Sequence, residues 1–140
     1  MYGWGRGARP TFSDWLVGRL QAGEEVPVFI DQYRSPLFVG QAAEVIGQLT
    51  QAPEVRGVLN CGGGERLSRY DFGRTFCDVF DFPHSLLRAI EMDTLNQAAK
   101  RPRDCSLDSL KLSDLLHIKP LTVREGLERM KRERVGGAPC

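Results

Sequence analysis

Two short arginine-bearing segments contain the side chains of this sequence that are best suited to bind a ligand. The first is Q-Y-R-S-P, from Gln32 to Pro36, and the second is K-R-P-R-D, from Lys100 to Asp104. Proline restricts the backbone of both segments. Guanidinium groups bind carboxylates and phosphates through paired hydrogen bonds. If the two segments converge they form a clamp for a diphosphate, whereas each arginine taken alone is better explained by a surface salt bridge.

The glycine run Gly62–Gly64 is a second candidate for anion binding. It follows an apolar segment and precedes a predicted helix, where backbone N–H groups can hold a phosphate. Its spacing matches neither G-x-G-x-x-G nor G-x-x-x-x-G-K-[ST]. A tight turn between a strand and a helix is the better interpretation.

Neither nucleophilic catalysis nor metal binding is indicated. The G-x-S-x-G pattern is absent, and His84 and His117 fall in a turn and at a helix end, where a structural role is expected. The four cysteines are widely and irregularly spaced without C-x-x-C, so zinc binding is not expected. We expect reduced thiols, because the N-terminus lacks the apolar region of a secretory signal.

The composition excludes several classes of protein. Of the 140 residues, 41% are hydrophobic and 26% are charged, which is typical of one globular domain. The formal net charge of +1 provides no field that favours nucleic acid or an anionic membrane. No apolar run approaches the roughly 20 residues of a membrane span. We therefore expect a cytoplasmic protein that binds neither nucleic acid nor a membrane.

Hydrophobic periodicity predicts the elements that position the arginines. Strands are expected at Val26–Ile30 and Leu37–Val39, on either side of the first arginine segment. Val55–Cys61 is predicted to be the most buried strand, and Leu86–Met92 is predicted to be a further strand. Five helices are expected, beginning near Phe12, Val39, Ser68, Leu107 and Thr122, with capping-box patterns at Thr11 and Thr122.

The buried faces of these helices follow from the same periodicity. Trp15 is expected in the core rather than at a site, and Ile46 on the buried face of the second helix with Ala42 and Val45. The mixed charges of the last helix are expected to face solvent. The architecture predicted is α/β, with about five helices, short strands of mixed direction and no complete doubly wound sheet.

Four motifs in order make the chain resemble a known family. The first motif begins at Phe12 and reads F-x-D-W-L-x-x-x-L-x-x-G-E-x-V-x-V-F-x-D-Q-Y-R-S-P. The other three follow in the order G-E-R-L-S-R-Y-D-F, R-P-R-D-C-S-L-D-S-L-K-L and L-T-V-R-E-G-L. From Tyr2 to Met130 the chain is similar to the C-terminal half of dTDP-4-dehydrorhamnose reductases, in the extended short-chain dehydrogenase/reductase superfamily. The resemblance implies the substrate-binding portion of that fold, lacking most of the Rossmann domain, with a domain over residues 1–135 and a flexible tail over 136–140.

The resemblance also implies site residues and a ligand. In this family the domain holds a nucleotide diphospho-sugar over a Rossmann domain, so Gln32, Arg34 and Arg101 are candidate substrate contacts, with Tyr33 and Arg103 as further candidates. The intact enzyme uses NAD(P)H, a G-x-x-G-x-x-G loop and a Tyr-x-x-x-Lys pair. Both patterns are absent here. No catalytic, cofactor-binding or metal-binding residue is therefore assigned, and no cofactor is expected for this chain alone.

The absent patterns leave three interpretations open. The first is a sugar-nucleotide-binding fragment of an NAD(P)-dependent reductase, inactive alone and in need of a missing Rossmann half. The second is a non-catalytic module that contacts a partner enzyme subunit, similar to the regulatory β subunit of methionine adenosyltransferase, which shares R-P-R-x-x-x-L-D. The third is an incomplete fold of marginal stability, whose unpaired strand edges favour association.

Overall fold

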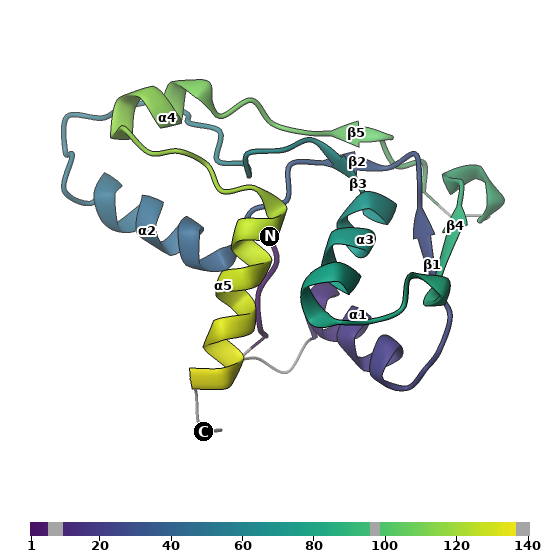
Figure 1. Ribbon diagram of the computed structural model, residues 1–140. Helices are drawn as coiled ribbons and strands as arrows, with labels where there is room; N and C mark the ends of the chain where they lie inside the picture. The colour runs from purple at the N-terminus through teal and green to yellow at the C-terminus, as the bar shows by residue number, and fades with distance from the viewer. Residues whose placement is uncertain (6–9, 96–98, 137–140) are drawn as a thin grey trace.

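The computed structural model describes residues 1–5, 10–95 and 99–136. Within these ranges, helices and short strands alternate along the chain in a mixed α/β arrangement, as expected from the sequence (Figure 1). Two single turns of 3₁₀ helix, His84–Leu86 and Met92–Thr94, flank one of the strands. The elements are the helices α1 (Phe12–Gln21), α2 (Val39–Leu49), α3 (Arg69–Phe80), α4 (Leu110–Leu116) and α5 (Val123–Gly136), and the strands β1 (Val26–Phe29), β2 (Tyr33–Arg34), β3 (Leu67–Ser68), β4 (Leu87–Ile90) and β5 (Asp104–Cys105).

The strands form two small sheets. β1 and β4 pair in parallel along their full length. β2 is the central strand of the second sheet, antiparallel to β3 and parallel to β5. Tyr33 therefore has Ser68 as its partner on one side and Asp104 on the other. The mixed strand directions confirm the prediction, and the second sheet places residues from three distant parts of the chain side by side.

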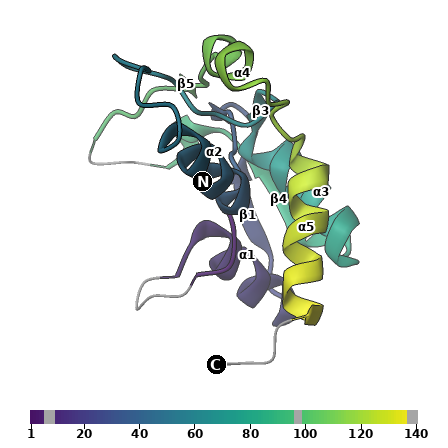
Figure 2. The ribbon, with the colours of Figure 1, turned by 90° about the vertical axis from the view of Figure 1, so that its left-hand side faces the viewer.

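The core lies between α1, α3, α5 and the β1–β4 pair. Phe76, Leu127 and Met130 are fully buried where α3 and α5 pack against each other, and the two helices lie side by side in Figure 2. The Phe76 and Phe80 rings stack with centroids 4.4 Å apart. Leu127 and Met130 are three positions apart, a spacing that places both on one face of α5.

Side-chain caps fix where the long helices begin. The Thr11 hydroxyl accepts a hydrogen bond from the Asp14 N–H (3.2 Å), and the Asp14 carboxylate accepts one from the Thr11 N–H (2.8 Å). Thr122 and Glu125 make the same reciprocal pair at the start of α5. Both capping boxes predicted from the sequence are confirmed. Each satisfies helix N–H groups that would otherwise lack partners.

The prediction of a buried strand at Val55–Cys61 is wrong. This segment is irregular, and the Val58 side chain is 85% exposed. Gly57 adopts a left-handed φ of +92°, which interrupts the extended run. Among the described residues, no strand pairs with it. An apolar run indicates what a segment would bury, but not whether a partner strand lies beside it.

The strand prediction at Leu37–Val39 is also wrong. Leu37 and Phe38 are buried as expected, but Phe38 is the N-cap of α2 and makes only an isolated parallel bridge to Tyr2. The helix begins at Val39 and leaves no room for a strand. Regular strand pairing occurs instead at Tyr33–Arg34, within the first arginine-bearing segment. The β1 and β4 predictions are confirmed.

Two apolar side chains expected in the core lie at the surface. Trp15 is 39% exposed, because α1 turns Leu16 and Leu20 to the core and leaves Trp15 at its edge. Ile46 is 62% exposed, because α2 buries only the side of Ala42 and Val45. One further prediction falls mostly outside the described residues. Of the tail 136–140, only Gly136 is described, as the last residue of α5.

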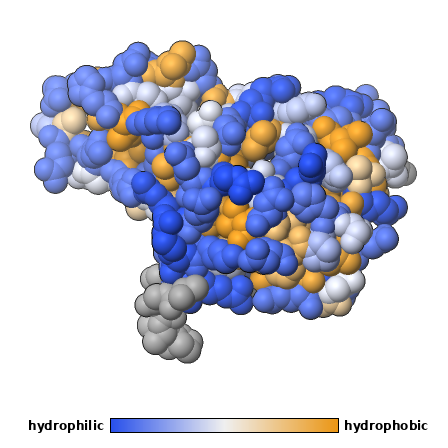
Figure 3. All heavy atoms as spheres, in the orientation of Figure 1, coloured by the Kyte–Doolittle hydropathy of each residue, from blue (hydrophilic) through white to orange (hydrophobic). Residues whose placement is uncertain are grey.

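Hydrophilic side chains cover most of the face seen in Figure 3, and apolar side chains reach it in separate patches. One such patch lies over the lobe that holds α2 and α4. Leu110, the first residue of α4, is 67% exposed. Over the described ranges, no helix is both long enough and apolar enough to cross a bilayer.

Candidate functional site

Strand pairing brings the two arginine-bearing segments together. The Tyr33 N–H donates a 2.6 Å hydrogen bond to the carbonyl oxygen of Arg103. Tyr33 and Arg34 then pair in register with Asp104 and Cys105. The backbones of the two arginine-bearing segments therefore lie side by side.

A third arginine, Arg69, joins this group, although it was not expected from the sequence. It is the first residue of α3, directly after the N-cap Ser68. The antiparallel pairing of β2 with β3 sets Arg34 opposite Leu67, two residues before Arg69. The only signal in the sequence was its position after a helix cap. The pairing that carries it to Arg34 joins residues more than 30 positions apart.

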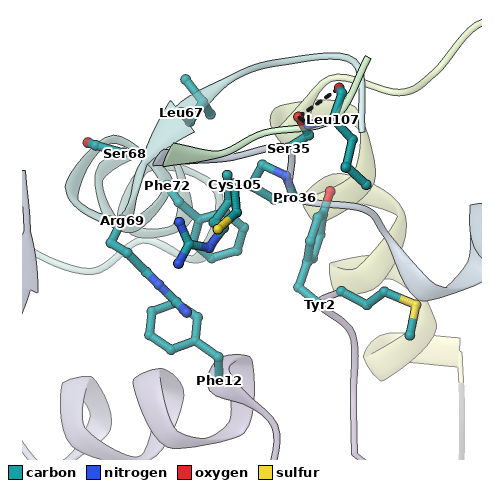
Figure 4. A pocket seen from close by; sticks show the side chains of 12 residues that line it. Tyr2, Phe12, Ser35, Pro36, Leu67, Ser68, Arg69, Phe72, Cys105 and Leu107 are labelled. Atoms are coloured by element: carbon teal, nitrogen blue, oxygen red, sulfur yellow. Dashed lines mark hydrogen bonds between the residues drawn. The ribbon is translucent and has the colours of Figure 1, made fainter. Parts of the chain in front are cut away.

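The Arg69 guanidinium is held in a partly buried environment. It lies over the Phe12 ring at 4.4 Å from the ring centroid, and its Nε donates a 3.0 Å hydrogen bond to Gln32 Oε1. Figure 4 shows it reaching from the start of α3 toward Phe12. Burial, and then repulsion from Arg34, lower the pKa of Arg69 below its ordinary value.

The positive charge of this pair is not compensated by acidic side chains. Neither Arg34 nor Arg69 forms an ion pair with a carboxylate in the part of the chain that the structure describes. Two like charges that lie close in a partly buried site destabilise each other. A bound anion would relieve that repulsion, so the pair is suited to a phosphate or carboxylate group.

Two neighbouring cavities border this charge. One, of about 290 Å³, is lined on its polar side by Arg34, Ser35 and Arg69. The other, of about 330 Å³, is lined by Gln32, Arg69 and Arg101 together with aromatic side chains. Phe12 and Arg69 border both cavities, so Arg69 can reach a ligand in either. The remaining side chains around the first cavity include Tyr2, Pro36, Leu67, Phe72, Cys105 and Leu107 (Figure 4).

Three of the five predicted site residues gather around Arg69. Arg34 lines the first cavity and Arg101 the second. Gln32 is only 5% exposed. Its amide oxygen accepts a hydrogen bond from Arg69, and its Nε2 lies 3.8 Å from the Met92 sulfur.

Tyr33 belongs to a different cluster. Its ring lies under the Arg66 guanidinium, 3.7 Å from the centroid, and Arg66 forms a 2.7 Å ion pair with Asp104. Hydrogen bonds from Ser106, and then the contact with Arg66, lower the pKa of Asp104 to about 2. The charge of Arg66 is thus compensated, unlike that of Arg69.

Arg103 is engaged by two carboxylates. It forms ion pairs with Asp31 and, at 2.6 Å, with Asp93. Asp31 also accepts a 3.0 Å hydrogen bond from the Met92 N–H. Arg103 therefore ties the loop that carries Arg101 to the end of β1, and it borders neither of the two cavities.

The glycine run does not offer a phosphate loop. The N–H groups of Gly62, Gly63 and Gly64 donate to Ser109 Oγ, the Ser35 carbonyl and the Leu121 carbonyl respectively. An N–H that already donates within the chain is not free to hold a phosphate. A Cβ on Gly63 would lie 1.8 Å from the Pro36 carbonyl oxygen, so glycine is required there for close backbone approach. The predicted tight turn between a strand and a helix is also not found, because the run follows an irregular segment and is followed by β3 (Leu67–Ser68) before α3 begins.

These groups favour binding over proton transfer. Arginine remains protonated and acts as a hydrogen-bond donor, with no acceptor of its own. The aromatic faces of Phe12 and Trp15 beside the guanidinium groups can accommodate a planar ring. The arrangement can therefore hold an anionic ligand that carries a flat group.

Known proteins with related sequences and structures include reductases and an enzyme subunit. Residues 3–135 match the family model described as the RmlD substrate binding domain. A probable low-salt glycan biosynthesis reductase, Agl14, from Haloferax volcanii is 32% identical over 69% of the chain, and methionine adenosyltransferase 2 subunit beta from Pongo abelii is 34% identical over 60%. The crystal structure of dTDP-4-dehydrorhamnose reductase from Bacillus anthracis in complex with NADP superimposes on 91% of the chain, with a TM-score of 0.81 and 20% identity.

The chain is shorter than all three of these proteins. It spans 32% of the length of the Haloferax reductase, 26% of the Pongo subunit and 44% of the Bacillus reductase chain. The structural match at 20% identity establishes a shared fold.

Proposed function

The chain belongs to the RmlD substrate binding domain family, and we propose that it binds the diphosphate of a nucleotide sugar between Arg34 and Arg69. This membership confirms the family resemblance of the four sequence motifs. The single observation that carries the proposed function is the pair of uncompensated guanidinium groups bordering one cavity. A diphosphate carries enough negative charge to satisfy both.

Arg101 and the aromatic side chains extend the proposed site. Arg101 lines the second cavity together with Arg69. Phe12 and Trp15 line the same cavity and would contact the base of the nucleotide. The sugar nucleotide would then lie across both cavities, with its diphosphate near Arg69.

Hydride transfer is not proposed for this chain by itself. The Bacillus reductase was solved with NADP, but this sequence has neither G-x-x-G-x-x-G nor Tyr-x-x-x-Lys. Its glycine run has no N–H group free to hold a phosphate. The residues present do not fit a dinucleotide, so we propose that reduction in a complete enzyme depends on residues outside this chain.

Calorimetric titration of the folded chain with dTDP tests the proposed function. We expect binding that weakens as salt is added, since charged contacts are screened, and little binding of thymidine, which lacks phosphate. Arg34→Ala and Arg69→Ala should each reduce the affinity for dTDP. Arg88→Ala is the matched control, because Arg88 is an exposed arginine on β4. Absence of dTDP binding by the folded chain, or equal affinity of all four proteins, would overturn the proposal.

A second candidate function is a non-catalytic module that contacts a partner protein. Two observations favour it. The chain is similar to a protein named as a subunit of methionine adenosyltransferase 2, and the apolar residues Ile46 and Leu110 are exposed on the α2–α4 lobe. Sedimentation of the chain with a partner enzyme, compared for the natural protein and Ile46→Glu, tests this function. A complex that Ile46→Glu abolishes, with dTDP binding unchanged, would support it. The absence of any complex would contradict it.

A further inference from the structure

Arg69 is restrained by one neighbouring residue through two contacts. Its backbone N–H donates a 3.1 Å hydrogen bond to the Gln32 carbonyl oxygen, and its Nε donates a 3.0 Å hydrogen bond to Gln32 Oε1. Phe12 supports the flat face of the guanidinium. Gln32 engages only Nε, and within residues 1–5, 10–95 and 99–136 no hydrogen bond is made by the two terminal nitrogens of Arg69, which can therefore face a ligand.

Gln32 is itself held in place. Its side chain is 5% exposed, and Nε2 lies 3.8 Å from the sulfur of Met92, which is also buried. The Met92 N–H is fixed in turn by the Asp31 carboxylate at 3.0 Å. A buried amide with both ends in contact has few alternative rotamers, so it provides a rigid acceptor for Arg69.

The Gln32 amide oxygen that accepts the hydrogen bond from Arg69 is neutral, so it does not compensate the positive charge of Arg69. Arg34 repels Arg69, and a free guanidinium would turn away from its neighbour toward solvent. A carboxylate in the place of Gln32 would hold Arg69 equally well but would cancel its charge. An amide oxygen fixes the direction of the guanidinium and leaves the full positive charge for the ligand.

We infer that Gln32 is a positioning residue, whose neutral amide oxygen holds the Arg69 guanidinium beside Arg34 so that both can bind one diphosphate. The inference rests on the proposed function and assigns Gln32 a role through Arg69 instead of direct contact with substrate. Fixing a side chain before binding lowers the entropy that the complex must lose. Gln32 therefore determines affinity for the charged part of the ligand.

A double-mutant cycle measured by calorimetry with dTDP tests this role. Gln32→Met keeps the side-chain volume but removes the acceptor, and should weaken binding about tenfold, the size expected for a hydrogen bond to a charged group. In the Arg69→Ala background the same change should have no further effect, because its target is gone. Equal effects in both backgrounds would show a merely structural role and overturn the inference.

Two further variants separate positioning from loss of structure. Gln32→Glu retains the acceptor and the shape, so we expect Arg69 to stay ordered while the affinity for dTDP still falls. An affinity equal to or above that of the natural protein would refute the requirement for a neutral acceptor. Gln41→Met is the matched control, since Gln41 is also buried but bonds to Lys119 and Leu121 far from the site. We expect it to lower stability and leave affinity unchanged.

The direction of Arg69 in the ligand-free protein supplies an independent measurement. The Nε–H resonance of Arg69 should exchange slowly with water in the natural protein and in Gln32→Glu, and rapidly in Gln32→Met. Rapid exchange in the natural protein would overturn the inference even if Gln32→Met failed to fold. Failure of the proposed function is distinguishable, because then the natural protein itself binds no dTDP.

Discussion

The Tyr33 N–H donates its hydrogen bond to the Arg103 carbonyl oxygen at 2.6 Å, and this contact joins the two arginine-bearing segments across 70 residues of sequence. It sets the register in which Arg34 lies opposite Cys105. β3 occupies the other edge of the same strand, so that Arg69 follows directly. One two-residue strand thus determines which guanidinium groups share a site.

Arg34→Gln should weaken dTDP binding without lowering the stability of the fold. The substitution removes one of the two groups that hold the diphosphate, and a loss on the order of tenfold or more is expected for a charged contact. It also removes the repulsion on Arg69, so the free energy of unfolding should stay within about 0.5 kcal/mol of its natural value. Urea unfolding and calorimetry measure the two quantities, and a large loss of stability would show that Arg34 has a structural role.

Arg101→Ala and Arg103→Ala form a matched pair within one loop. Arg101 borders the cavity beside Arg69, whereas Arg103 is engaged by Asp31 and Asp93. We expect Arg101→Ala to reduce affinity for dTDP and leave stability unchanged. Arg103→Ala should lower stability by about 1 kcal/mol, because the partly buried Asp31 loses its partner, and should reduce affinity less. The reverse order of affinities would show that Arg103 is the ligand contact.

Gly63→Ala should destabilise the protein by about 1–3 kcal/mol, the cost of overpacking. A Cβ at this position would lie 1.8 Å from the Pro36 carbonyl oxygen, and backbone atoms on both sides resist movement. Gly47→Ala is the control, because Gly47 is an exposed residue of α2 with open space around it. Replacing that helical glycine should stabilise the fold by roughly 0.5–1 kcal/mol. Thermal unfolding of both variants checks the pair, and equal shifts would contradict the expectation.

The Asp104 carboxyl should titrate near pH 2 in the folded chain, below its ordinary pKa of 3.8. Because folding lowers this pKa, its contribution to stability is complete above the ordinary value and is lost as the pH falls toward 2. Carbon NMR of the carboxyl group measures the midpoint. Ser106→Ala removes the hydroxyl donor but keeps the Ser106 N–H, and Arg66→Gln removes the ion pair, so each substitution should raise the midpoint. A midpoint that neither substitution raises would contradict this assignment.

The sequence by itself determined the features that depend on neighbouring residues. Thr11 with Asp14 and Thr122 with Glu125 mark helix starts because each cap joins residues three positions apart. The buried face of α5 follows from 3.6-residue periodicity. The four motifs identified the family because their residues and their order are read directly from the sequence, without the fold.

Only the tertiary structure decided which distant residues meet. Val55–Cys61 has the composition of a strand, but the described chain supplies no strand beside it. Arg69 has the local signature of a helix start, and it becomes part of the site only because β3 pairs with β2. The physical reason is the same in both cases. A strand forms its hydrogen bonds with another segment, so its existence and its neighbours are set by long-range contacts that local composition does not contain.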